Sequence, residues 1–284
     1  MAVPHRQRRL AGRHALVDGI RFEMPVHSEQ SPALMAAFPC DAEKAARLLP
    51  GGELHPFRLP GGRGLLVVTV IDYRVTDIGK YIEYSIAIAC THGPKPAPPL
   101  LPALFRTRYG LGQYVVDLPV STEVSVKGGK GIWGMPKHRA PLDFVEGEEW
   151  VSSQYDLDGR LVLRVDVRRP RLLRGFKIGL GAANYCAFRG MLMKSYIYFG
   201  ARAGFRLFDK DAARLTFGDH PRIAPVKALD VEPEPVFAAY LPESNGVLDD
   251  YFECWFLTHE APPAEAGEGL ESTFHLGTSE AWPP

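Results

Sequence analysis

The stretch GGKGIWGMPKHR, residues 128–139, decides how the chain is interpreted, because glycines and a proline surround Lys137. Glycine permits backbone angles with φ above zero, and Pro136 fixes its own φ and biases Met135 toward an extended conformation. The stretch is therefore predicted to be a strand or strand edge rather than a helix. In a pleated strand the side chains alternate between two faces. One face then carries Trp133, Met135, Lys137 and Arg139, and the other carries Ile132 and His138.

Apolar neighbours can lower the pKa of a lysine and so make its amine reactive. A free lysine has a pKa of about 10.4, so at pH 7 only roughly one in a few thousand is the neutral amine that attacks a carbonyl group. Lowering a lysine pKa to about 7 takes roughly 4.6 kcal/mol, and full burial alone can supply a shift of about 3 to 5 units. Desolvation by Trp133 and Met135 would therefore suffice for nucleophilic use of Lys137. The alternative is a surface lysine at a strand end beside a tight turn.

A carboxylate lies on a second strand, Tyr81–Cys90. The face that carries Glu83 otherwise holds Tyr81 and small residues, whereas the opposite face is aliphatic and aromatic. Small side chains leave volume in front of a sheet, so Glu83 is expected to point into a cavity. The alternative is that this face is solvated.

The bulk composition favours one large domain with a balanced surface charge. A chain of 284 residues with 46% hydrophobic content can bury a large core. Thirty-three basic and 33 acidic residues give a formal charge of zero, which directs the protein neither to nucleic acid nor to an anionic membrane. The four cysteines are far apart and form no CxxC pair, which favours a reducing, cytoplasmic compartment. The sequence contains no run of 18 apolar residues, so no membrane-spanning helix is predicted.

The two ends differ in composition from the domain expected at residues 21–260. Residues 1–20 are rich in arginine and lack the apolar core of a secretory signal, so a flexible basic tail is predicted, with a mitochondrial address as the alternative. Residues 261–284 are rich in proline, glycine and glutamate and are predicted to be a flexible acidic tail.

Most of the domain is predicted to be β structure. Helices are expected at residues 41–49, with Asp41 as the N-cap, and at residues 248–257, where apolar residues follow a helical stripe. Residues 91–109 are rich in proline and are expected to form an extended loop. Residues 178–199 are predicted to be buried structure of undetermined type. Strands are expected at residues 64–73, 81–90, 112–121, 123–127 and 214–217, with a hairpin over 151–167 that turns at Asp158-Gly159.

Several common motifs are excluded. Gly129, Gly131 and Gly134 spell GxGxxG, but in a dinucleotide site that glycine turn opens a helix, which Pro136 and Pro141 forbid here. No HExxH sequence or cysteine cluster predicts a metal site, and no cofactor is expected.

Several motifs, in order, resemble the acetoacetate decarboxylase family. The segment Gly134–His138 is similar to that family's small-aromatic-Pro-Lys-Lys signature, and Tyr81–Glu83 is similar to its Tyr-Thr-Glu. Residues Ala213–His220, followed by Pro225-Val226, resemble its late Arg-Leu-x-Leu-Phe-Asp-His stretch. The likeness extends over roughly residues 30–255 and includes a counterpart of the helix at residues 41–50.

The resemblance implies a mainly β, α+β fold: a cone-shaped, partly closed antiparallel barrel with flanking helices, assembled as a homo-oligomer. It also implies that Lys137 forms a Schiff base with a keto acid and that Glu83 faces this lysine. The expected catalytic residues are Lys137 and Glu83. The expected substrate-binding residues are Tyr81, Trp133, Met135, His138 and Arg139.

Two departures from the family pattern affect the predicted reaction. His138 replaces the second lysine, which weakens the route to a reactive amine through a cationic neighbour. The early arginine that faces the substrate in the family falls near Pro39, with Arg139 as the candidate replacement. Acetoacetate is therefore expected to be a poor substrate. Three hypotheses stay open: a decarboxylase of an acetoacetate-like β-keto acid, an aldolase or dehydratase of a pyruvate-like keto acid, and a non-catalytic binder of small ligands.

Overall fold

The computed structural model describes residues 12–170, 177–188 and 190–258, and its largest element is an 11-stranded sheet. Seven strands of this sheet form a closed ring, because β8 pairs with both β6 and β9. The ring runs, in order of pairing, through β9 (Gly112–Val120), β14 (Lys177–Phe188), β15 (Met191–Leu207), β17 (Phe237–Phe256), β4 (Ala33–Cys40), β6 (Gly64–Tyr73) and β8 (Tyr81–His92). All its pairings are antiparallel except β9 with β14. The predicted barrel is confirmed.

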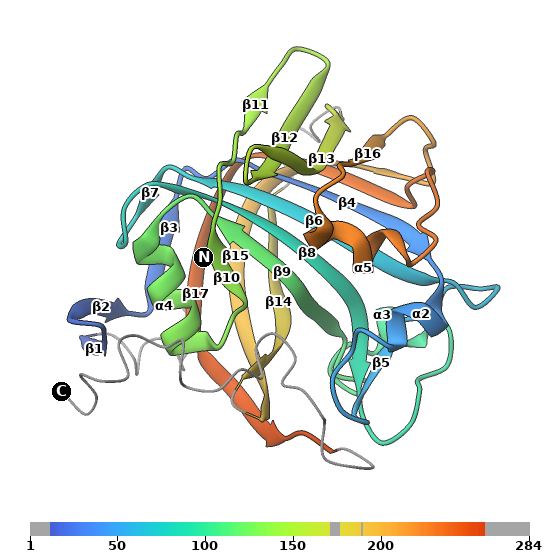
Figure 1. Cartoon of the computed structure of the whole chain (residues 1–284), viewed down its shortest axis with the longest axis horizontal. Helices are drawn as coiled ribbons and strands as arrows, with labels where there is room; N and C mark the ends of the chain where they lie inside the picture. The colour runs from blue at the N-terminus through green and yellow to red at the C-terminus, as the bar shows by residue number, and fades with distance from the viewer. Residues whose placement is uncertain (1–11, 171–176, 189, 259–284) are drawn as a thin grey trace.

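Smaller elements surround this ring (Figure 1). A four-stranded sheet lies at one end, and the hairpin of β1 and β2 lies beside α4. The strands outside the ring are β1 (Arg13–Val17), β2 (Ile20–Met24), β3 (Val26–Glu29), β5 (Leu54–Pro56), β7 (Val75–Thr76), β10 (Lys137–Arg139), β11 (Val145–Glu146), β12 (Trp150–Leu157), β13 (Arg160–Arg168) and β16 (Ala213–Phe217). The helices are α2 (Ala42–Ala46), α3 (Leu101–Leu104), α4 (Glu123–Trp133), the 3-10 turn η1 (Pro221–Ile223) and α5 (Ala224–Lys227). None of the described helices is long and apolar enough to cross a membrane.

Local sequence signals explain several of these elements. The Asp41 carboxylate caps α2 by accepting hydrogen bonds from the backbone N–H groups of Glu43 and Lys44, both at 2.9 Å. The hairpin of β12 and β13 turns at Asp158 and Gly159, whose φ values of 50° and 72° suit a two-residue primed turn. The pairing of β6 with β8 is antiparallel, as predicted.

The prediction for residues 123–133 was wrong, because this segment is the helix α4 rather than a strand. Glycine has a low helix propensity, but the glycines of this helix allow close packing. A Cβ on Gly128 would lie 2.6 Å from Phe22, and a Cβ on Gly131 would lie 2.6 Å from Val17. The backbone of α4 therefore packs directly on the hairpin of β1 and β2. The helix ends at Gly134, where φ is 63°, and only the residues after it are extended.

The helix predicted at residues 248–257 was also wrong, because β17 continues through Phe256. It pairs with β15 from the Met191–Phe256 pair to the Leu207–Phe237 pair. The pairing register shifts three times, and the two shifts opposite residues 248–253 interrupt the alternation of faces in this segment. Such interruptions give the apolar residues a spacing that resembles a helical stripe. In the segment of undetermined type at residues 178–199, residues 178–188 belong to β14 and residues 191–199 to β15.

Within the basic tail predicted at residues 1–20, residues 13–17 form β1 and pair with β2. Residues 1–11 of the predicted basic tail and the whole predicted acidic tail at residues 261–284 lie outside the described residues.

Candidate active site

Lys137 lies at the start of β10, a short strand that pairs in parallel with β9 at the edge of the large sheet. Only 2% of its surface is exposed. Trp133 and Met135 are buried beside it in one apolar cluster with Val115 and Leu118. Lysine is almost never buried in this way unless it is paired, so its partners indicate its role.

The partner of Lys137 is Glu83, on β8. The Lys137 Nζ lies 2.7 Å from the Glu83 Oε2, and the Glu83 side chain is itself only 10% exposed. The same Nζ donates a hydrogen bond to the Ser125 Oγ at 3.0 Å and lies 5.4 Å from the centre of the Tyr81 ring. Residues far apart in the sequence are thus joined in one buried polar group.

Two tyrosines extend this group. The rings of Tyr73 and Tyr81 stack with their centres 4.5 Å apart. Burial, and then the negative charge of Glu83, raises the pKa of both phenols well above the ordinary value. Hydrogen bonds from Ser125 and Tyr73 oppose this rise at Tyr81. Because a raised pKa extends the protonated form to higher pH, both phenols are neutral hydrogen-bond donors at pH 7.

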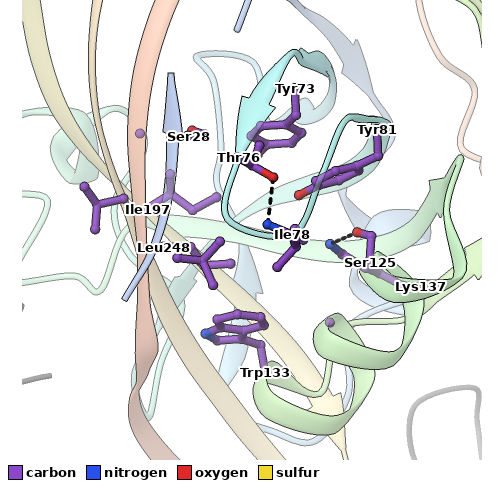
Figure 2. A pocket seen from close by; sticks show the side chains of 14 residues that line it. Ser28, Tyr73, Thr76, Ile78, Tyr81, Ser125, Trp133, Lys137, Ile197 and Leu248 are labelled. Carbon is purple, nitrogen blue, oxygen red and sulfur yellow. Dashed lines mark hydrogen bonds between the residues drawn. The ribbon is translucent and has the colours of Figure 1, made fainter. Parts of the chain in front are cut away.

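A pocket opens in front of Lys137, and its cavity volume is about 30 Å³ (Figure 2). Its residues come from α4, from the strands β3, β6, β7, β8, β10, β15 and β17, and from the β7–β8 turn. The lining residues are Val26, Ser28, Tyr73, Thr76, Ile78, Tyr81, Ser125, Gly129, Trp133, Lys137, Ile197, Gly246, Val247 and Leu248. A cavity of this volume has room for about two water molecules.

Of the residues predicted from the sequence, the structure brings together Lys137, Glu83, Tyr81 and Trp133, with Met135 packed beneath them. It does not bring His138 or Arg139 to the pocket lining, and Arg139 is exposed.

The His138 side chain instead contacts a second polar group that joins the large sheet to the four-stranded sheet. Its Nε2 lies 2.9 Å from the Tyr155 hydroxyl, which donates to the Asp117 Oδ2 at 3.2 Å. Arg222 donates to both Asp117 oxygens, at 3.0 and 2.7 Å, and its Nη2 lies 3.3 Å from the His138 Nδ1. The predicted alternation of faces along β10 explains this placement, because Lys137 and His138 point to opposite sides of the sheet.

Ser125 and Gly129 were not predicted as site residues, although the sequence carries a signal for them. Ser125, Gly129 and Trp133 are spaced four residues apart, which places them on one face of a helix. That face lines the pocket, so recognising α4 as a helix would have identified these residues.

Gly129 sets how deeply α4 packs on the lysine, and we expect Gly129→Ala to lower turnover by about tenfold or more. A Cβ at this position would lie 2.2 Å from the Lys137 Cδ, so the side chain must move. Displacement of a reacting group by about 1 Å can cost roughly 10²-fold in rate. Steady-state kinetics and circular dichroism check this prediction, since alanine favours the helix itself.

The control for this substitution is Gly131→Ala, which creates a similar clash with Val17 but none with Lys137. This variant should lose stability and keep its turnover per folded molecule. Equal losses of turnover in both variants would mean that the glycine contact on Lys137 has no special importance.

In the described ranges 12–170, 177–188 and 190–258, no three His, Cys, Asp or Glu side chains are grouped to hold a metal ion.

The fold and the site together define a class: a mainly antiparallel β-barrel protein that buries a lysine–carboxylate pair at the wall of a small pocket. The chain belongs to the acetoacetate decarboxylase family, whose model matches residues 11–180. No curated protein matches this sequence.

Solved structures share the fold at low sequence identity. Acetoacetate decarboxylase from Legionella pneumophila is 13% identical, with a TM-score of 0.59, over 80% of this chain and 86% of that chain. The enduracididine biosynthesis enzyme MppR, solved with the condensation product of pyruvate and imidazole 4-carboxaldehyde, is 17% identical, with a TM-score of 0.55, over 84% and 90%. An acetoacetate decarboxylase-like enzyme from Sphingomonas wittichii RW1 is 15% identical, with a TM-score of 0.55, over 82% and 95%.

Proposed function

We propose that this protein is a carbon–carbon lyase that forms an imine between Lys137 and the keto group of a small substrate. The observation that carries this proposal is the Lys137 amine, buried at the pocket wall with the Glu83 carboxylate at 2.7 Å. Membership in the acetoacetate decarboxylase family supports it. No cofactor is needed, because the iminium itself accepts electrons.

The chemistry starts from the neutral amine, so the Lys137 ammonium first gives a proton to Glu83. The amine nitrogen then bonds to the carbonyl carbon, and the oxygen leaves as water with the two amine hydrogens. One returned proton makes the resulting imine an iminium cation. When a carbon–carbon bond beside it breaks, its electron pair moves to the iminium nitrogen and forms an enamine. Protonation of the enamine carbon and hydrolysis release the product and restore the lysine, with Glu83 as the proton relay.

Two reactions share this imine and enamine, and they differ in whether the enamine forms by cleavage of a carbon–carbon bond or by loss of a proton from the carbon next to the iminium carbon. The family default is decarboxylation of an acetoacetate-like β-keto acid, in which the broken bond releases CO₂. The second candidate is aldol or dehydration chemistry on a pyruvate-like compound. The second is favoured by the positions of His138 and Arg139, which leave Lys137 as the charged residue of the described pocket lining. The pyruvate condensation product bound to MppR, which shares this fold, also supports it.

We expect the purified protein to release CO₂ from acetoacetate more slowly than it forms products from pyruvate plus an aldehyde. Decarboxylation breaks the bond to the carboxylate, so a lost charge-assisted contact to that group costs about 1.5 to 3 kcal/mol, roughly one to two orders of magnitude in rate. Condensation leaves the pyruvate carboxylate intact and depends less on that contact. CO₂ release and chromatography of the products measure the two reactions. Fast CO₂ release would assign decarboxylation, whereas no turnover and no covalent adduct with any carbonyl compound would favour a non-catalytic binder.

A further inference from the structure

The pocket in front of Lys137 has mainly apolar walls, and its polar groups are hydroxyls. The apolar lining residues are Val26, Ile78, Trp133, Ile197, Val247 and Leu248. Ser28, Tyr73, Thr76, Tyr81 and Ser125 contribute hydroxyls, and two glycines complete the wall. Figure 2 shows Ile78, Trp133 and Leu248 around the space next to Lys137 and Ser125. Among the described lining residues, Lys137 is the one that carries a charge.

The charge of Lys137 is already balanced by Glu83, at 2.7 Å and 10% side-chain exposure. When the amine becomes an iminium, the cation keeps this counter-ion. A substrate carboxylate would add a second negative charge beside the same cation. Burying a charge without its own partner is unfavourable, since neither water nor a second cation compensates for its lost hydration.

The arginines near the site have other partners. Arg74 follows Tyr73 in the sequence and pairs with Asp72 at 2.8 Å and Glu146 at 2.5 Å. Arg222 pairs with Asp117, at 2.7 Å, in the polar group behind β10. Recruiting either arginine for a substrate carboxylate would break an existing ion pair.

The hydroxyl groups of the pocket suit a substrate whose hydrogen-bond acceptor is an uncharged oxygen. Tyr73 and Tyr81 are buried and protonated, and the Tyr73 O–H is directed to Tyr81 and Glu83, so Tyr81 is the phenol whose neutral O–H can face a substrate. A neutral donor satisfies a ketone or amide oxygen without leaving an uncompensated charge.

We propose that the Lys137 pocket selects uncharged carbonyl compounds, such as ketones, aldehydes and keto amides, over keto acids of the same size. This inference rests on the proposed imine chemistry and narrows its substrate class. It favours cleavage or condensation of a neutral substrate over loss of CO₂.

The test compares pyruvate with pyruvamide, which have the same number of heavy atoms and differ in charge. Each is incubated with the full-length protein and cyanoborohydride, and labelling of Lys137 is followed by peptide mass spectrometry. The rates are divided by those for butylamine in solution, which removes the intrinsic difference in carbonyl reactivity. We expect the corrected rate for pyruvamide to exceed that for pyruvate by about tenfold or more.

A second experiment introduces a cation that could pair with a substrate carboxylate in the pocket. Ile78 lies on the β7–β8 turn and lines the pocket. Ile78→Arg should shift the preference toward pyruvate by about tenfold, whereas Ile78→Met should leave it unchanged. The comparison in the natural protein decides the question even when the arginine variant does not fold.

The outcomes separate the two proposals. Faster corrected labelling of Lys137 by pyruvate would overturn the substrate inference and leave the imine function standing. Labelling of Lys137 by neither compound would overturn both.

Discussion

We expect Lys137→Met to abolish turnover, with a fall of roughly 10³-fold or more, because no other group of the described pocket lining can form an imine. Methionine has a similar length and no charge, so it removes the nucleophile without opening a large cavity. Product formation under saturating substrate measures the loss, and thermal unfolding checks that the barrel is intact. Removal of a buried charge can change stability, so turnover is compared per folded molecule.

The chain offers a matched control in Lys194. This lysine is also buried, pairs with Glu253 at 3.0 Å, and lies within 6 Å of the ring centres of Tyr185 and Tyr196. It does not line the pocket. Lys194→Met should therefore keep turnover near normal in the folded fraction. Normal turnover in Lys137→Met, or equal loss in both variants, would remove Lys137 from the reaction.

We expect Glu83→Gln to lower turnover by roughly 10²-fold or more, because a positioned proton-transfer group contributes about 10² to 10⁴. Glutamine keeps the size and the hydrogen-bonding oxygen of glutamate but cannot accept the lysine proton. The variant should still fold and form the imine more slowly, which single-turnover kinetics with reductive trapping can measure.

Glu253→Gln makes the same chemical change at the Lys194 pair and serves as the control. Its turnover should stay within about twofold of normal, as expected for a group remote from the reaction. A Glu83→Gln protein with nearly normal turnover would show that Glu83 holds the lysine in place without moving protons.

The sequence alone predicts the part of the site that rests on short, local patterns. Strand alternation places Glu83 on a face of small residues, and the Met-Pro-Lys segment fixes an extended backbone at Lys137. The family resemblance adds the prediction that Glu83, on β8, faces Lys137, on β10, which the local pattern of neither strand indicates. Their contact at 2.7 Å depends on β8 and β10 flanking β9, which is a property of the whole sheet.

The rest of the site depends on tertiary contacts that outweigh local preference. The glycines in residues 128–131 favour neither helix nor strand, and only their close packing on Phe22, Val17 and Lys137 explains the helix. Ser125 lies on this helix, so its contact with Lys137 could not be predicted while the segment was interpreted as a strand. Likewise, β17 follows its partner β15 through three register shifts, which no periodicity in its own sequence reveals. Assembly as a homo-oligomer stays a prediction.

The most direct test of the imine is mass spectrometry after reduction with borohydride in the presence of pyruvate, acetoacetate and their amides. Imine chemistry predicts one reduced adduct, located by peptide mapping at Lys137 and missing from Lys137→Met. The same map should show Lys194 unmodified, which separates a specific imine from general lysine labelling. An unchanged protein mass with every compound, or an adduct that persists in Lys137→Met, would contradict the proposed function.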